Sequence, residues 1–179
     1  MPEIQIRPAV AADFPRLMGF DHSCSSDYVW QLDLQKGGGQ TMATFREVRL
    51  PRSIQVPYPR DVFALADAWE RQPGILLAVL RNQPVGYLHV LEQRTSALAW
   101  VVDLAVSVEM RRHGVASALI LAAQDWALER GHQRIILEMS SKNYPAVRLA
   151  QKLGYEFCGY NDHYYATQDI ALFFGRALK

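Results

Sequence analysis

Hydrophobic and polar residues alternate along the N-terminal third of the chain, which is the pattern of strands with one buried face. Residues 3–7 predict a first strand, and residues 12–20 predict a short helix. Residues 28–35 place a tyrosine, a tryptophan and two leucines on one face, and residues 41–50 predict the returning strand after a glycine-rich turn. Residues 51–59 contain three prolines, so we expect a loop there.

The rest of the chain alternates between helical and strand patterns. Residues 61–69 predict a helix that turns Phe63 and Leu65 inward. Residues 98–106 are apolar on both faces of a strand, so we expect that strand in the centre of a sheet. The other predicted elements are hairpin strands at 75–80 and 85–91, a helix from Val115 to Gly131, a strand at 135–139, a helix from Asn143 to Leu153, and strands at 155–159 and 170–177. This order is typical of an α/β domain.

A basic glycine turn stands between the predicted central strand and the helix that follows it. Residues 111–116 are Arg-Arg-His-Gly-Val-Ala, and they follow an apolar stretch that begins near Asp103. The first turn of a helix has backbone N–H groups without intrahelical partners, at the positive end of the helix dipole. A strand that leads through such a turn into a helix is a common phosphate-binding arrangement. The turn is therefore a candidate anion site, although many turns of this composition bind nothing.

Length, charge and cysteine content narrow the class of protein. The chain has 179 residues, half of them hydrophobic, so we expect one domain over residues 1–179. A net charge of +1 argues against nucleic acid or an anionic membrane as a partner. The two cysteines and five histidines have no metal-ligand spacing, and we find no signal or spanning segment. We expect a cytoplasmic protein without a metal site, and we keep a homodimer as one assembly to test.

A second motif follows the basic turn in the C-terminal half. Residues 143–156 are Asn-Tyr-Pro-Ala-Val-Arg-Leu-Ala-Gln-Lys-Leu-Gly-Tyr-Glu. Together with the turn, in which Arg111, Gly114 and Ala116 match the pattern Arg/Gln-x-x-Gly-x-Gly/Ala, this motif resembles the GCN5-related N-acetyltransferase (GNAT) family. The resemblance implies an α/β (α+β) fold. Its mixed central sheet would have about seven strands, splayed in the middle, and about four flanking helices.

The resemblance also implies a reaction and a cofactor site. The reaction is transfer of an acetyl group from acetyl-CoA to a primary amine by direct attack on the thioester. The turn would hold the pyrophosphate of CoA through backbone N–H groups, and the Val106 N–H would polarise the thioester carbonyl. Asn143 would help to order the cofactor arm. The cofactor-binding residues implied in this way are Ala105, Val106, Arg111, Arg112, His113, Gly114, Val115, Ala116, Ser117 and Asn143.

Three short stretches in the N-terminal half carry a narrower resemblance. They are Asp-His-Ser at 21–23, Ser-Asp at 26–27 and Phe-Arg-Glu-Val at 45–48. These stretches resemble the streptothricin (nourseothricin) acetyltransferases within the family. That subgroup implies a small-molecule amine as the acceptor, such as a streptothricin-like antibiotic. It also implies three substrate-binding candidates, although solvated acids at a hairpin edge would give the same pattern: Asp21, Asp27 and Glu47.

Two carboxylates interrupt strands that are otherwise apolar. Asp103 lies within the strand at 98–106, and Glu138 lies within the strand at 135–139. An alkylammonium has a pKa of about 10.4, so it must lose a proton before it attacks. Burial raises the pKa of a carboxylate, and two acids in one cleft would attract a cationic amine. We therefore take Asp103 and Glu138 as catalytic candidates. The alternative is that each pairs with an arginine or a hydroxyl for structural reasons.

One departure from the family pattern matters most. The family commonly has a tyrosine in its second motif as the general acid for the departing thiolate, and this chain has Ala150 there. A thiol has a pKa of about 8.5, so its thiolate leaves tolerably without an acid. Tyr144, Tyr155, Tyr164 or a water remain candidates for the general acid, and we count Tyr155 among the catalytic residues. We expect Ala150→Tyr to be neutral or activating. Two alternatives stay open: a non-catalytic acyl-CoA-binding or regulatory module, and an acetyltransferase that acts on protein amines.

Overall fold

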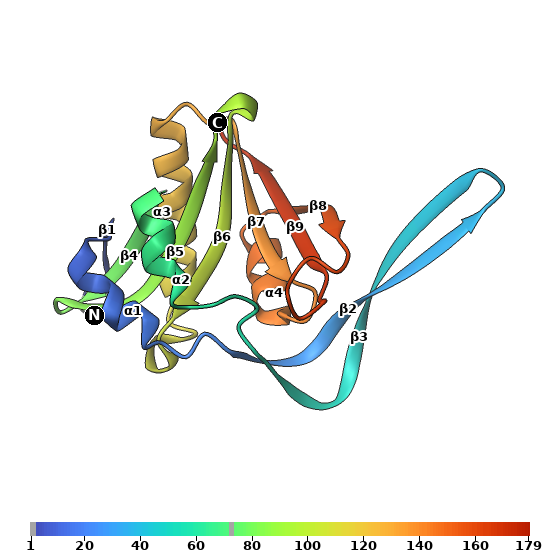
Figure 1. Ribbon diagram of the computed structural model, residues 1–179, viewed down its shortest axis with the longest axis horizontal. Helices are drawn as coiled ribbons and strands as arrows, with labels where there is room; N and C mark the ends of the chain where they lie inside the picture. The colour runs from blue at the N-terminus through green and yellow to red at the C-terminus, as the bar shows by residue number, and fades with distance from the viewer. Residues whose placement is uncertain (1–2, 72–73) are drawn as a thin grey trace.

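The centre of the fold is a seven-stranded mixed sheet (Figure 1). The computed structural model describes residues 3–71 and 74–179. Within these residues the strand order is β1-β4-β5-β6-β7-β9-β8, and β6 and β7 form the one parallel pair. The predicted mixed sheet is confirmed. Its strands are β1 (Gln5–Pro8), β4 (Ile75–Leu80), β5 (Gln83–Gln93), β6 (Leu98–Val106), β7 (Arg134–Ser140), β8 (Glu156–Asn161) and β9 (Ala171–Ala177).

The sheet opens between its two parallel strands. Paired residues run from Leu98 opposite Arg134 to Val101 opposite Leu137, and the pairing ends there. Beyond these residues the ribbons of β6 and β7 diverge (Figure 1). Backbone groups of the diverging segments are therefore not needed for β6–β7 pairing, and the expected splay in the middle of the sheet is confirmed.

A bulge in β6 lies where the opening begins. Asp103 is opposite His89 on β5, whereas Val101 is opposite Val90, so Val102 is an additional residue in β6. A bulge bends its strand and changes the direction of the neighbouring side chains. Asp103 is the first residue after this bulge, which places it in the segment of β6 that still pairs with β5 but no longer with β7.

Helices cover both faces of the sheet and define two buried clusters. The helices α3 (Val115–Glu129) and α4 (Tyr144–Lys152) pack on one face, over a cluster that includes Leu88. The short helices α1 (Phe14–Met18) and α2 (Ala64–Arg71) contribute to a cluster on the other face that includes Tyr87. Successive residues of a strand point to opposite faces, which explains why neighbouring residues of β5 belong to different clusters.

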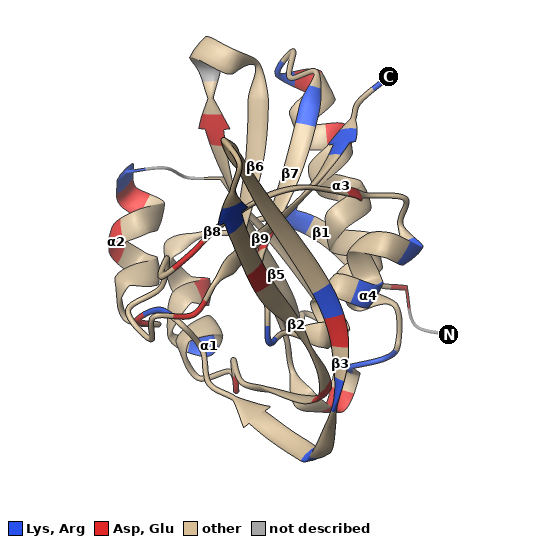
Figure 2. Cartoon of the chain, turned by 90° about the vertical axis from the view of Figure 1, so that its right-hand side faces the viewer, with Lys and Arg blue, Asp and Glu red and all other residues tan. Residues whose placement is uncertain are grey.

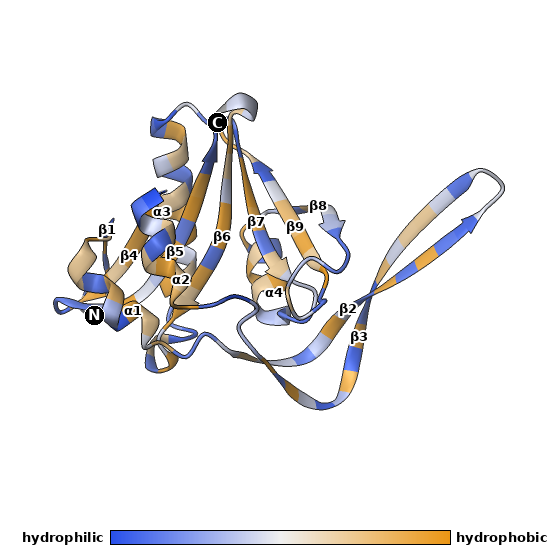
Figure 3. Ribbon diagram, viewed as in Figure 1, coloured by the Kyte–Doolittle hydropathy of each residue, from blue (hydrophilic) through white to orange (hydrophobic). Residues whose placement is uncertain are grey.

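A long hairpin projects from the body of the molecule (Figure 1). Its strands, β2 (Cys24–Gly37) and β3 (Gln40–Val56), form a separate two-stranded sheet. Gly38 and Gly39 connect them with φ angles of 60° and 75°, which favour glycine and match the tight turn of a hairpin. Orange and blue positions alternate along both strands in Figure 3. The predicted half-burial holds only near the base of the hairpin, where Tyr28, Trp30 and Leu32 are partly buried, whereas residues 33–44 are all exposed.

Two predictions about this part of the chain were wrong. The predicted loop at 51–59 is strand as far as Val56. Proline is accommodated because the pairing is irregular there: Tyr28 is opposite Arg49, whereas Ser26 is opposite Ile54. In addition, Phe63 is 72% exposed, since it precedes the first turn of α2, whereas Leu65 is buried as predicted.

Charged residues of both signs are interspersed over the hairpin and helices, as Figure 2 shows for one side of the molecule. This distribution agrees with the nearly balanced net charge. None of the helices in the described ranges has the length and apolar character needed to cross a membrane.

Candidate active site

A cleft of about 790 Å³ follows the opening between β6 and β7. The first turn of α3 lines one part of it, and the acidic residues of the two strands line another. Residues 21–25, residues 56–60 and part of α4 complete the wall. The cleft brings together most of the residues predicted from the sequence, namely Asp21, Asp103, Ala105, Val106, Arg111, Arg112, Gly114, Val115, Ala116, Ser117, Glu138 and Asn143.

Asp103 is a buried carboxylate with one arginine close to it. Its side chain is 11% exposed, and its Oδ1 lies 3.7 Å from Nη1 of Arg60. Burial raises the pKa of Asp103 to about 6, and repulsion from Glu138 acts in the same direction. Arg60 and a hydrogen bond from the Tyr58 hydroxyl act in the opposite direction, but burial outweighs them. A carboxylate with a pKa near neutrality is suited to accept a proton at physiological pH.

Glu138 is surrounded by hydrogen-bond donors. Its side chain is 1% exposed and forms an ion pair with Arg60. Trp100 Nε1 donates to Oε2 at 2.9 Å, and the hydroxyls of Tyr164 and Tyr165 each donate to the carboxylate at 3.2 Å. A buried charge that is paired and hydrogen-bonded in this way is held in place. This geometry favours a positioning role for Glu138, and it leaves Asp103 as the better proton acceptor.

Arg60 connects the two carboxylates. Its Nη2 pairs with Glu138, its Nη1 donates to the Val102 carbonyl at 2.9 Å, and its guanidinium lies 5.2 Å from the centre of the Tyr165 ring. The sequence left open that each acid pairs with an arginine for structural reasons. In the structure a single arginine, Arg60, pairs with both acids. Two carboxylates and one guanidinium leave this part of the cleft with a net negative charge when both acids are ionised.

Arg60→Gln is expected to shift the pH dependence of turnover. Without the guanidinium, repulsion between the two carboxylates is no longer offset, so the pKa of Asp103 rises above about 6. A base acts in its deprotonated form, so the acidic limb of the kcat/KM profile should move up by about one pH unit. The profile is measured by thiol release from pH 5.5 to 9. Arg7→Gln is the control, because it breaks an ion pair to Asp13 outside the cleft; an acidic limb that stays in place in Arg60→Gln would contradict this account.

The basic turn has the open geometry of an anion site. Gly114 is the residue before α3, with a φ of 85°, and no side chain caps the helix within the described residues. A Cβ atom at Gly114 would meet no atom within 4 Å, so the backbone there is open to a ligand. The first N–H groups of the helix have no intrahelical partner and lie at its positive end.

The arginines of the turn have different surroundings. Arg111 donates to the Val106 carbonyl at 3.2 Å and to the Asp21 carbonyl at 2.6 Å, so its side chain braces the turn against β6 and the N-terminal segment. Arg112 has a φ of 66° and lines the cleft. His113 does not line the cleft, and its Nδ1 lies 2.8 Å from the Arg111 carbonyl.

The predicted residue at the start of α4 has a clear local role. Asn143 precedes the helix and accepts a hydrogen bond from the Ala146 N–H at 3.2 Å. This is the capping interaction that its position in the sequence predicts. Asn143 also lines the cleft.

Besides His113, three predicted residues lie outside the cleft. Tyr155 is 3% exposed, and its hydroxyl accepts from Gln124 at 2.9 Å. Asp27 accepts a hydrogen bond from Ser53, and Glu47 accepts one from Tyr144 at 2.9 Å. The hairpin that contains both acids points away from the opening in the sheet, whereas Asp21 precedes the hairpin and lines the cleft.

The position of the absent tyrosine is in the core. Ala150 is fully buried in the cluster under α4 and does not line the cleft. The expectation that Ala150→Tyr is neutral or activating is therefore replaced. A tyrosine side chain would overpack this cluster, and we expect a loss of stability of about 1–3 kcal/mol. Urea unfolding measures it, with Ala122→Tyr, at a partly buried position on α3, as the comparison; equal stability of Ala150→Tyr and the unmodified protein would contradict the expectation.

Several residues of the site were missed at the sequence level. They come from the segment before β2, the proline-containing loop, β6 and the segment before β9, and they are His22, Tyr58, Arg60, Trp100 and Tyr165. A useful signal was present in Tyr-Pro-Arg at 58–60, because prolines hold a loop rigidly and polar residues on such a loop can be placed accurately.

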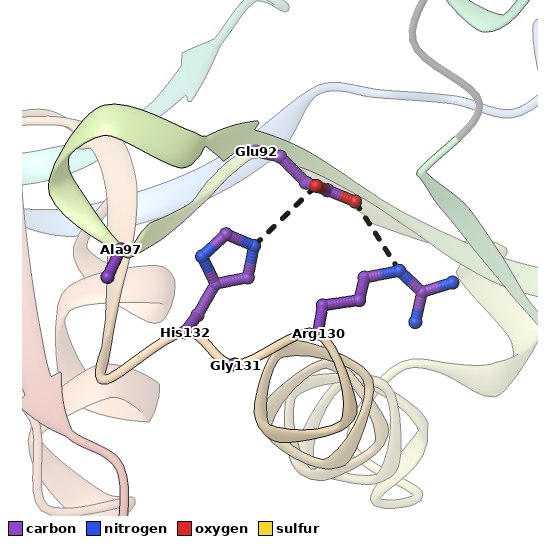
Figure 4. A pocket seen from close by; sticks show the side chains of 5 residues that line it. All are labelled: Glu92, Ala97, Arg130, Gly131 and His132. Atoms are coloured by element: carbon purple, nitrogen blue, oxygen red, sulfur yellow. Dashed lines mark ion pairs between the residues drawn. The ribbon is translucent and has the colours of Figure 1, made fainter.

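A second, smaller hollow lies at the opposite end of α3 (Figure 4). Its volume is about 430 Å³, and Glu92, Ala97, Arg130, Gly131 and His132 line it. Glu92 lies between Arg130 and His132, 3.4 Å from Arg130 Nε and 3.8 Å from His132 Nε2. This hollow shares no lining residue with the larger cleft. In the described residues, no cluster of three histidine, cysteine, aspartate or glutamate side chains suited to a metal ion is found.

Comparison with known proteins identifies the class. The sequence model of the acetyltransferase (GNAT) family matches residues 42–155, and the chain belongs to this family. Its fold is the GNAT fold, and its activity is acetyl-CoA-dependent N-acetylation, as the two motifs predicted.

Individual relatives include streptothricin and nourseothricin acetyltransferases, the group of the narrower resemblance. The chain is 24% identical over 166 residues to the streptothricin acetyltransferase of Streptomyces lavendulae, which covers 90% of this chain and 86% of that protein. It is 32% identical over 123 residues to the L-amino acid N-acetyltransferase of Escherichia coli (strain K12), covering 63% of this chain and 72% of that protein. Among solved structures, nourseothricin acetyltransferase is similar with a TM-score of 0.80 at 24% identity, over 98% of this chain and 99% of that one.

Proposed function

We propose that this protein acetylates a primary amine of a small cationic molecule, such as a streptothricin-like antibiotic, with Asp103 as the base. The observation that supports this most directly is that one cleft contains both the open turn at Gly114 and the buried carboxylate of Asp103. The turn suits a phosphate group, and the carboxylate suits an ammonium. A cofactor and an acceptor bound at these two places would meet in the opening between β6 and β7.

The residues around the turn fit acetyl-CoA. The open backbone at Gly114 and the uncapped start of α3 would hold the pyrophosphate. The segment of β6 that pairs with β5 but no longer with β7, which contains Ala105 and Val106, would hold the pantetheine arm through the backbone groups of its open edge. Val115 is 1% exposed, so its contribution would come from its N–H rather than its side chain. When bound, acetyl-CoA supplies an acetyl group activated as a thioester.

Asp103 would prepare the acceptor for attack. The acceptor arrives as an ammonium of pKa about 10.4, and Asp103 would take one proton from its nitrogen. Glu138 is held by Arg60 and by its other hydrogen-bond donors, and its carboxylate would keep the site negatively charged without changing its position. Asp21 lines the same cleft and would add attraction for a cationic acceptor.

The charge of the site favours one acceptor class over another. With both carboxylates ionised, the two acids exceed the single Arg60, so a polycationic amine fits better than a zwitterionic L-amino acid. The first class matches the acceptor that gives the streptothricin acetyltransferases their name, and the second matches the L-amino acid N-acetyltransferase of E. coli. We therefore place the cationic antibiotic first and an L-amino acid second.

An acceptor screen tests the proposal. Thiol release from acetyl-CoA is followed with streptothricin, lysine derivatives and L-amino acids, and the products are identified by mass spectrometry. The expected result is turnover with a cationic amine that is lost in Asp103→Asn and kept in Asp33→Asn, an exposed aspartate on the hairpin. Tight binding of acetyl-CoA without thiol release from any acceptor would instead support a non-catalytic module. Labelled protein in a lysate would support a protein substrate.

The projecting hairpin supports a homodimer as the assembly. Every residue from 33 to 44 is exposed, including Leu34 at 43% and Met42 at 54%. Trp30 and Phe45 pack the base of the hairpin against the core, but its exposed tip is a two-stranded ribbon without such support, and a second copy packed on that tip would stabilise it. Light scattering coupled to size exclusion should give twice the chain mass, falling to one chain mass in Leu34→Glu/Met42→Glu. A monomer in the unmodified protein would rule the dimer out.

A further inference from the structure

Side chains bridge the opening between β6 and β7 at the point where strand pairing stops. The pairing ends at Val101 and Leu137, so backbone hydrogen bonds no longer set the distance between the two strands beyond these residues. The next residues along, Val102 on β6 and Glu138 on β7, are both bound by Arg60. Its Nη1 donates to the Val102 carbonyl at 2.9 Å, and its Nη2 pairs with the Glu138 carboxylate. Arg60 thus connects the two strands where their backbone pairing no longer does.

The bridge is rigid because of the group that forms it and the contacts that hold that group. A guanidinium is planar, and the distance between its two terminal nitrogens is fixed. Arg60 directly follows a Pro-Tyr-Pro segment, in which the prolines restrict the backbone, and its guanidinium lies 5.2 Å from the centre of the Tyr165 ring. Trp100 Nε1, on β6, also donates to Glu138 at 2.9 Å. The two strands are therefore connected twice, once through Arg60 and once through Trp100.

The opening is also the place where a transferred acyl group would lie. The turn at Gly114 and the carboxylate of Asp103 belong to one cleft, and Asp103 directly follows Val102. The last paired residues, Val101 and Leu137, line this cleft and are 3% and 4% exposed. Their apolar side chains bound the narrow end of the opening. The distance between the strands therefore decides how large a group fits beside Asp103.

We propose that Arg60 is a positioning residue that fixes the width of the opening between β6 and β7, and that this width makes the enzyme selective for acetyl-CoA over longer acyl-CoA thioesters. This role rests on the proposed function, which places the thioester in the opening. One extra methylene in an apolar pocket changes kcat/KM by about 10–200-fold. Walls that can move apart accommodate the methylene, and they also hold the acetyl group less accurately for attack. Arg60 therefore acts by holding the strands, in addition to the effect of its charge on Asp103.

Arg60→Lys separates the bridge from the charge. Lysine keeps the positive charge beside the two acids, but its ammonium is a single centre on a flexible chain and does not reproduce the fixed span. Selectivity is measured as kcat/KM with acetyl-CoA divided by kcat/KM with propionyl-CoA, by thiol release with the same amine. We expect a ratio of at least about ten in the unmodified protein and a fall of at least about fivefold in Arg60→Lys, whereas the acidic limb of the pH profile stays in place. Both donors are measured on the same preparation, so partial unfolding of a variant would lower both values and leave the ratio unchanged.

Two further variants serve as controls. Arg7→Lys is the matched control, because Arg7 pairs with Asp13 outside the cleft, and its ratio should stay within twofold of the unmodified protein. Trp100→Phe keeps an aromatic ring and removes the donor to Glu138, so it should lower the ratio by a smaller factor than Arg60→Lys does. A ratio within twofold of the unmodified protein in Arg60→Lys would overturn the bridge and leave Arg60 with its charge alone. An unmodified protein without a preference for acetyl-CoA would overturn the bridge as well.

Binding without turnover separates this role from the proposed function. Calorimetry with acetyl-CoA and with propionyl-CoA gives the ratio of their dissociation constants without an acceptor. The unmodified protein should bind acetyl-CoA more tightly, and Arg60→Lys should reduce this difference at least about threefold. If no amine is acetylated but the binding ratio falls as expected, the proposed function fails and the bridge stands. If amines are acetylated and neither ratio changes in Arg60→Lys, the bridge is wrong and the proposed function stands.

Discussion

Asp103→Asn is expected to lower kcat by at least about 100-fold while acetyl-CoA still binds. Asparagine has nearly the same shape and cannot accept the proton of the ammonium, and the open turn at Gly114 is left unchanged. Thiol release measures kcat, and calorimetry measures the affinity for acetyl-CoA. Asp33→Asn, on the exposed hairpin, controls for the loss of a carboxylate elsewhere. A variant that keeps its kcat would show that another group, or water alone, removes the proton.

The pH dependence of the unmodified enzyme follows from the same residue. The base acts when deprotonated, so kcat/KM should rise with pH through about 6 and then level off. In the Asp103→Asn variant this rise should disappear from the residual activity. A profile that falls with increasing pH over this range would contradict the role of Asp103 as the base.

The Asp103→Asn substitution should also increase the stability of the protein above neutral pH. The pKa of Asp103 is about 6 in the folded state and 3.8 without its surroundings, so the folded state binds this proton more tightly. The contribution of this proton to the free energy of unfolding is present in full below pH 3.8 and is lost as the pH rises through about 6. At pH 8 the loss amounts to at most about 3 kcal/mol, and the asparagine variant avoids it. Thermal unfolding at pH 8 should therefore give a Tm about 5 °C higher for Asp103→Asn.

Gly114→Glu is expected to abolish binding of acetyl-CoA. The substitution places a negative charge where the first N–H groups of α3 would meet the pyrophosphate. A φ of 85° also strains any side-chain-bearing residue, but a Cβ there meets no atom within 4 Å, so the fold should survive. Calorimetry with acetyl-CoA measures the affinity, and a value within twofold of the unmodified protein would show that the turn is not the phosphate site.

The other end of the same helix provides a matched control. Gly131 follows α3, has a φ of 78°, and also has open space around a Cβ. Gly131→Glu therefore introduces the same charge and the same kind of backbone strain away from the cleft. It should bind acetyl-CoA normally. Equal loss of binding in both variants would mean that backbone strain, rather than charge at the turn, is responsible.

Local features of the site were predicted from the sequence with good accuracy. The turn at 111–116 and the cap at Asn143 depend on residues that are neighbours in the chain, so their geometry is encoded locally. The central position of β6 followed from an apolar pattern on both of its faces. Predictions that depended on which side of the hairpin faces the body were less successful, and Asp27 and Glu47 lie outside the cleft.

The environment of the acids could not be read from the sequence. Arg60 is 78 residues from Glu138 and 42 from Val102, to which it also donates. His22 and Tyr87 are 65 residues apart. A strand pattern indicates that an acid is buried, but the direction of its pKa shift depends on every charge and hydroxyl that packs against it. Those partners belong to segments that are distant in the sequence.

The sequence by itself therefore determined the family, the basic glycine turn before α3 and the two acids that interrupt β6 and β7. Each of these depends on backbone propensity or on the periodicity of one element. Only the tertiary structure decided that Glu138 is held by Arg60, that Asp103 keeps a pKa of about 6, and that Ala150 belongs to the core. The physical reason is that burial and charge pairing depend on distances between segments, and folding alone sets those distances.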